Sequence, residues 1–158
     1  MKPTDLFKPP KLTGRVSAGL LILRVLIGFA FMNHGFGKIQ NPFGWMGPDS
    51  SVPGLFQALA ALSEFGGGLA WILGLLTPLA SLGIASTMIV ATCLHAFVFG
   101  DPFVAGGPGQ GSYEPASVYL AFAIFLLLAG PGSFSLDRVV FGEKGADVDQ
   151  GRAWSSSN

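Results

Sequence analysis

Four long apolar segments constrain what this chain can fold into more than any other feature. They cover residues 17–35, 55–76, 78–99 and 115–129. A helix needs about 20 apolar residues to cross a bilayer core; the first three segments have that length and the fourth is shorter. Half of the 158 residues are hydrophobic and 11% are charged, whereas an average soluble domain is about 25% charged. The sequence therefore predicts an all-α protein, an integral membrane four-helix bundle.

Basic residues at both ends of the chain predict its orientation. Four precede the first apolar segment and three follow the last one, so the positive-inside rule places both termini in the cytoplasm. We expect a basic cytoplasmic tail over residues 1–16, a transmembrane domain over 17–138, and a polar, disordered tail over 139–158. The first segment lacks a small-x-small cleavage site and is expected to remain as an uncleaved span.

Very few ionisable side chains lie inside the apolar segments. They are Arg24, His34, Glu64 and His95. Such groups are costly at membrane depth and are usually paired and functional, so these four are our candidate catalytic residues. Counted from the outer ends of the segments, Arg24 and Glu64 both lie roughly 15–18 Å deep, whereas both histidines lie within about one turn of the surface.

The helical phase of the first two segments predicts that Arg24 pairs with Glu64. Five residues share one face of the first helix at spacings of three and four: Arg24, Gly28, Phe31, Gly35 and Lys38. If that face meets the Glu64 face, a charge-assisted contact offsets the desolvation of both ions. The pair could serve a substrate or proton path, or it could only fix helix register. The many small residues of the first three segments predict close helix packing.

The histidines leave several kinds of site open. Two imidazoles at one depth could be axial haem ligands or part of a metal site, could exchange protons with a quinone, or could form hydrogen bonds at the interface; we favour quinone over haem and predict no metal site. The candidate cofactor-binding residues are His34, Lys38, His95 and Tyr113. Lys38 is expected to reach toward the head groups, and Asp137 to form a local ion pair with Arg138.

Several classes of function are disfavoured by the motifs that the sequence lacks. No nucleotide loop, zinc-protease, serine-hydrolase or CxxC pattern occurs in a usable context. The single cysteine, Cys93, cannot form an intrachain disulfide. The formal net charge is zero, which gives no indication of a nucleic-acid partner.

Four segments together resemble the DoxX family, small four-span bacterial membrane proteins related to the DoxD-type subunit of thiosulfate:quinone oxidoreductase. They are residues 24–38, 64–78, 88–95 and 128–137. The resemblance implies a four-helix bundle in the bacterial inner membrane and an association with respiratory or redox-stress systems, often as one subunit of several.

Three functions follow from the residues and the resemblance. The first is a membrane subunit of a quinone-linked redox complex, in which the polar residues contact a quinone or relay its protons and other membrane or peripheral subunits supply electrons. The second is a non-catalytic assembly or anchoring subunit. The third is a small transporter or lipid-binding bundle. In each case the partners include the lipid bilayer, and a homo-oligomer is compatible with all three.

Overall fold

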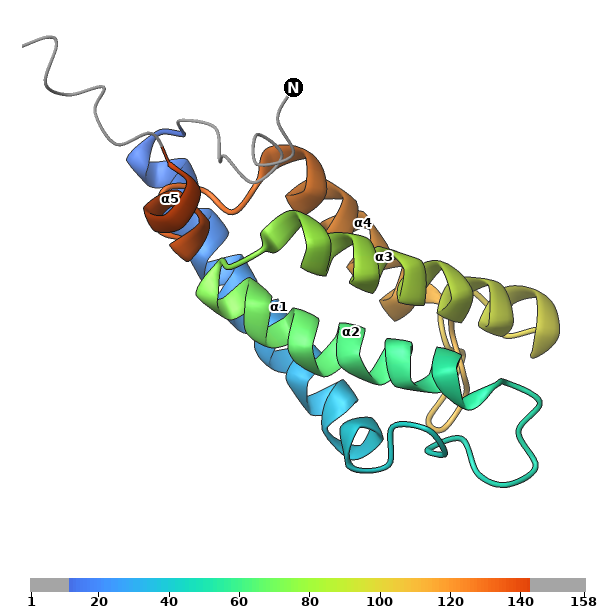
Figure 1. Ribbon diagram of the computed structural model, residues 1–158. Helices are drawn as coiled ribbons and strands as arrows, with labels where there is room; N and C mark the ends of the chain where they lie inside the picture. Colours follow the sequence, from blue (N-terminus) through green and yellow to red (C-terminus); the bar gives the residue numbers. More distant parts are fainter. Residues whose placement is uncertain (1–11, 143–158) are drawn as a thin grey trace, which may run out of the picture.

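The computed structural model describes residues 12–142, and the regular secondary structure of this part of the chain is helical throughout, with loops between the helices (Figure 1). The helices are α1 (Gly14–Gln40), α2 (Gly54–Leu73), α3 (Thr77–Cys93), which a π-helical turn η2 (Leu94–Val98) extends, α4 (Glu114–Ala129) and the short α5 (Leu136–Phe141). No strand occurs among these residues, which confirms the predicted fold class. Most of the tails predicted over residues 1–16 and 139–158 lies outside the described residues, and α1 begins inside the first of them.

Within residues 12–142, three helices are long and apolar enough to cross a membrane. They are Gly14–Gln40, Gly54–Leu73 and Thr77–Val98, and α4 is a shorter apolar helix. The loops after α1 and before α4 lie at one end of the bundle, and the α2–α3 turn lies at the other, close to α5 and the start of α1 (Figure 1). We call these the outer and inner ends, following the predicted orientation.

Glycines bring α1 and α2 into backbone contact, as the small residues predicted. A Cβ atom on Gly28 would lie 2.6 Å from the carbonyl oxygen of Gly68, and one on Gly68 would lie 2.6 Å from that of Gly28. Further along, a Cβ on Gly35 would collide with the backbone of Phe65. No side chain fits at these positions, so the glycines fix how α1 lies along α2.

The first helix is longer than the sequence predicted. We expected it to end near Gly35, but it continues through two glycines to Gln40. Gly35 is a packing position rather than a helix end, because the backbone of α2 occupies the space where its side chain would be. At about 1.5 Å per residue, Arg24 then lies roughly 24 Å from the outer end of α1, while Glu64 lies roughly 15 Å from the outer end of α2.

A tight turn joins α2 to α3, as predicted, and Asp137 holds it. Gly74 and Leu76 both adopt left-handed backbone conformations there. The two carboxylate oxygens of Asp137 accept hydrogen bonds from the backbone N–H groups of Leu76 (2.6 Å) and Thr77 (2.9 Å). The predicted local ion pair with Arg138 was wrong, since this carboxylate instead caps the start of α3.

An aromatic cluster joins α1, α2 and α4 in the core. The ring of Phe31 packs edge-on against Trp71 (5.5 Å between centroids) and Tyr119 (4.9 Å), and Trp71 packs against Phe122 (5.3 Å). The indole N–H of Trp71 donates to Ser81 on α3 at 3.0 Å. The four main helices thus share one core.

Candidate functional site

Arg24 does not pair with Glu64, so that prediction was wrong. Its guanidinium is fully buried at the inner end and donates to the backbone carbonyls of Pro131 and Phe134, the latter at 2.7 Å. The physical reason is the register set by the glycine contacts, which places Arg24 beside Gly74 rather than beside Glu64. Arg24 therefore ties the segment between α4 and α5 to α1.

Glu64 instead forms an ion pair with Lys38. The ammonium of Lys38 lies 2.6 Å from both carboxylate oxygens, and the Glu64 side chain is 4% exposed against 26% for Lys38. A contact of this kind offsets the cost of removing two charges from water. Lys38 was expected to extend toward the head groups; it turns into the bundle because Glu64 lies opposite it on α2.

The loop between α1 and α2 covers this ion pair. The ammonium of Lys38 lies 4.6 Å from the centre of the Trp45 ring, a distance at which a cation is attracted to the ring face. The Trp45 indole donates to the carbonyl of Gln57 at 3.0 Å. The buried Gln57 side chain accepts from the N–H of Met46 (3.0 Å) and donates to the carbonyl of Val52 (2.8 Å), so α2 fixes both sides of the loop.

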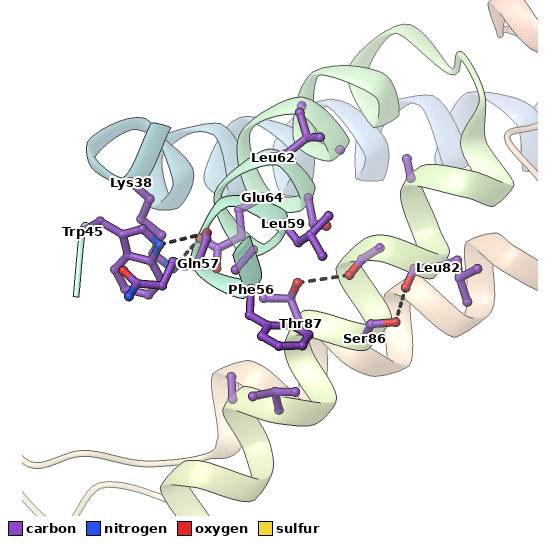
Figure 2. Close-up of a pocket in the computed structure, with 18 of the residues that line it drawn as sticks. Lys38, Trp45, Phe56, Gln57, Leu59, Leu62, Glu64, Leu82, Ser86 and Thr87 are labelled. Carbon is purple, nitrogen blue, oxygen red and sulfur yellow. Dashed lines mark hydrogen bonds and ion pairs between the residues drawn. The ribbon is translucent and has the colours of Figure 1, made fainter. Parts of the chain in front are cut away.

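A partly open groove of about 940 Å³ runs between α2 and α3 and reaches the ion pair (Figure 2). Most of its lining is aliphatic or aromatic. Its polar side chains are few: Lys38, Gln57, Ser63, Glu64, Ser86 and Thr87. Ser86 and Thr87 donate to carbonyls of their own helix, at 2.9 and 3.1 Å. The groove is therefore an apolar channel with one charged end.

The other predicted site residues lie elsewhere. His34 is exposed and packs against the ring of Tyr119 at 6.2 Å. His95 lies in the π-helical turn, where its Nδ1 is 2.6 Å from the carboxylate of Asp101. Tyr113 packs against Phe103 at 5.2 Å. None of the three predicted residues lines the groove, and residues 12–142 contain no group of three or more His, Cys, Asp or Glu that could hold a metal ion.

Sequence reasoning missed the ion pair although its signal was present. Lys38 was recognised on the same face of α1 as Arg24, so either cation could have met Glu64. The choice between Arg24 and Lys38 depended on where α1 ends. The glycines near its end suggested that the helix stops at Gly35, whereas it continues to Gln40. Trp45 and Gln57 gave no comparable signal, because their contacts depend on the fold of a Gly- and Pro-rich loop.

The family model of DoxX matches residues 19–99, which contain both members of the ion pair. The chain belongs to the DoxX family. It is 34% identical over 127 residues to the inner membrane protein YqjF of Escherichia coli strain K12, an alignment that covers 77% of this chain and 92% of that protein. No solved structure matches the chain. The protein is thus a multi-pass DoxX-family protein of the bacterial inner membrane, as predicted.

Proposed function

We propose that this DoxX-family protein is a membrane subunit of a quinone-linked redox or respiratory complex, and that the groove between α2 and α3 receives the quinone. The observation that carries the proposal is the groove itself, an apolar channel that ends at the partly buried Lys38–Glu64 ion pair. A quinone has the same division, with a polar ring at one end and an apolar tail.

The residues present fit such a molecule. An ammonium has three N–H donors, and Glu64 accepts two hydrogen bonds from Lys38, so one donor is left for a quinone carbonyl. Leucine side chains of both helices line the rest of the groove, among them Leu59, Leu62 and Leu82 (Figure 2). The tail would lie along these side chains, where polar groups would be costly.

A bound quinone would supply two-electron, two-proton chemistry. Lys38 would orient the head group by donating to a carbonyl oxygen, and the Glu64 carboxylate would accept or return a proton within the same ion pair. The groove would keep water from the tail, and a membrane or peripheral redox subunit would exchange the electrons. Arg24 takes no part, since it bonds to backbone carbonyls at the inner end.

The test is the quinone content of the purified protein. Leu82 lines the groove and is 55% exposed, so Leu82→Trp should fill the groove without disturbing the core. Ile124→Trp is the matched control, because Ile124 is 44% exposed on α4 and does not line the groove. We expect solvent extraction to recover quinone from the parent and the control, and background amounts from Leu82→Trp and Glu64→Gln. Equal quinone in all four proteins would contradict the proposal.

The same preparations test the remaining site predictions. His34, His95 and Tyr113 were predicted to bind the cofactor but lie off the groove, so we expect His34→Gln, His95→Gln and Tyr113→Phe to retain quinone. Loss of quinone in any of them would move the binding site away from α2 and α3. A Soret band in the absorption spectrum that disappears in His95→Gln would favour haem instead.

An assembly or anchoring role is the second candidate, and one observation favours it. Arg24 and Asp137 are fully buried and hold backbone groups of distant segments together, which is a structural use of charge. If Leu82→Trp and Glu64→Gln leave a partner complex assembled and fully active, while deletion of the whole chain prevents its assembly, the assembly role is the better account.

A further inference from the structure

Asn33 places a polar side chain on the side of α1 that faces away from the bundle. The buried side of this helix includes Arg24, Gly28, Phe31 and Gly35. Asn33 is exposed on the opposite side, in line at helical spacing with three large apolar residues that are 60–64% exposed. We call this surface, Ile22, Leu26, Phe29 and Asn33, the outer face of α1.

The carboxamide of Asn33 is only partly satisfied there. Its amide nitrogen donates to the carbonyl of Phe29, one turn earlier, at 2.8 Å, and this is its one hydrogen bond within residues 12–142. A carboxamide has a second N–H donor and an oxygen that accepts two bonds. Asn33 lies roughly 10 Å from the outer end of a helix about 40 Å long. If a bilayer core of about 30 Å is centred on this helix, Asn33 lies roughly 5 Å inside its outer boundary, where unpaired polar groups are costly.

We infer that the protein forms a parallel homodimer through the outer face of α1, with the two Asn33 carboxamides hydrogen-bonded to each other. Two copies inserted in the same direction are related by an axis along the membrane normal, so each residue near that axis meets its own copy at the same depth. A carboxamide suits such a contact because it both donates and accepts. Polar side chains of this kind join helices within membranes.

The apolar residues beside Asn33 also fit a second copy of the chain. Ile22, Leu26 and Phe29 extend the surface along α1 toward the inner end, and each would pack against its counterpart. The face carries no charge that would have to be neutralised, and Asn33 requires a donor and an acceptor at its own depth. A second copy of the chain supplies both, together with an identical apolar surface.

Disulfide cross-linking in native membranes tests the surface. In a Cys93→Ser background, Leu26→Cys and Phe29→Cys should give a product of twice the monomer mass on oxidation. Ile89→Cys is the matched control, since Ile89 is 50% exposed on α3, and it should remain monomeric. A product of any other mass, or equal cross-linking at Ile89, would overturn the proposal.

The role of Asn33 is tested by dimer affinity in lipid vesicles, measured by energy transfer between labelled copies at increasing dilution. Asn33→Leu should weaken the dimer about 3- to 20-fold, the range expected for hydrogen bonds between membrane helices, and Asn33→Gln should restore part of the loss. A parent protein that is monomeric at every dilution would overturn the proposal, as would an Asn33→Leu dimer of unchanged affinity. Neither readout depends on quinone, so the result is independent of the proposed function.

Discussion

Two buried ionic groups, one at the inner end of the bundle and one midway along α2, use charge in different ways. At the inner end, Arg24 is fully buried and its two hydrogen bonds go to backbone carbonyls. Midway along α2, Glu64 is also buried but pairs with a partly exposed lysine beside a partly open groove. A buried charge whose hydrogen bonds go only to backbone groups has a structural role, whereas a charge pair that borders a groove is accessible to a ligand.

The largest expected effect tests the structural half of this comparison. Arg24→Met keeps the length and apolar stem of the side chain but leaves the carbonyls of Pro131 and Phe134 without donors. Leaving a buried acceptor without a donor costs about 1–3 kcal/mol for each group. Because two carbonyls lose their donor, the thermal midpoint of the detergent-solubilised protein should fall sharply. Arg24→Lys should recover only part of the loss, because an ammonium does not reproduce the planar fork of a guanidinium. An unchanged midpoint in Arg24→Met would contradict the structural role.

A smaller loss of stability is expected from a substitution at the glycine contact between α1 and α2, which sets the register of the two helices. In Gly28→Ala the new methyl group would lie 2.6 Å from the Gly68 carbonyl oxygen, and overpacking of this kind costs about 1–3 kcal/mol. Gly19→Ala is the matched control on the same helix, since a Cβ there has nothing within 4 Å. The same thermal scan should show a loss for Gly28→Ala and no loss for Gly19→Ala. Equal midpoints would mean that α1 and α2 do not meet at Gly28.

The Lys38–Glu64 ion pair should contribute less to stability than the hydrogen bonds of Arg24 at the inner end. Glu64→Gln leaves Lys38 without its anion, but Lys38 is 26% exposed and can turn toward water. We expect a loss of about 1–2 kcal/mol, smaller than that of Arg24→Met, together with the loss of bound quinone. If Glu64→Gln were the more destabilising of the two, the division between structural and accessible charge would be wrong.

The smallest effect should come from the loop that covers the pair. Trp45→Phe keeps an aromatic face for Lys38, whereas Trp45→Leu removes it, and a cation–π contact at a partly exposed site contributes about 0.5–1 kcal/mol. Both variants lose the hydrogen bond to Gln57, so their difference in unfolding free energy isolates the ring contact. Identical stabilities would show that Lys38 does not use the ring face.

The sequence predicted what depends on local pattern. The four apolar segments, the turn at Thr77 and Pro78 and the packing of glycines between helices were all readable, because each depends on composition or helical spacing. The sequence did not predict the partner of Glu64. The first helix was expected to end near Gly35, and this made Arg24 look as deep as Glu64, whereas the helix continues to Gln40. The cap formed by Asp137 joins residues about 60 positions apart, and spacing within a helix carries no signal for such a contact.

The central claim is that Glu64 is coupled to Lys38 and not to Arg24, and double-mutant cycles test it most directly. Unfolding free energies would be measured for Glu64→Gln, Lys38→Met, Arg24→Met and the two double variants that contain Glu64→Gln. We predict a coupling energy of about 1–2 kcal/mol for Glu64 with Lys38, and additivity within about 0.5 kcal/mol for Glu64 with Arg24. A coupling between Glu64 and Arg24 as large as that with Lys38 would contradict the account.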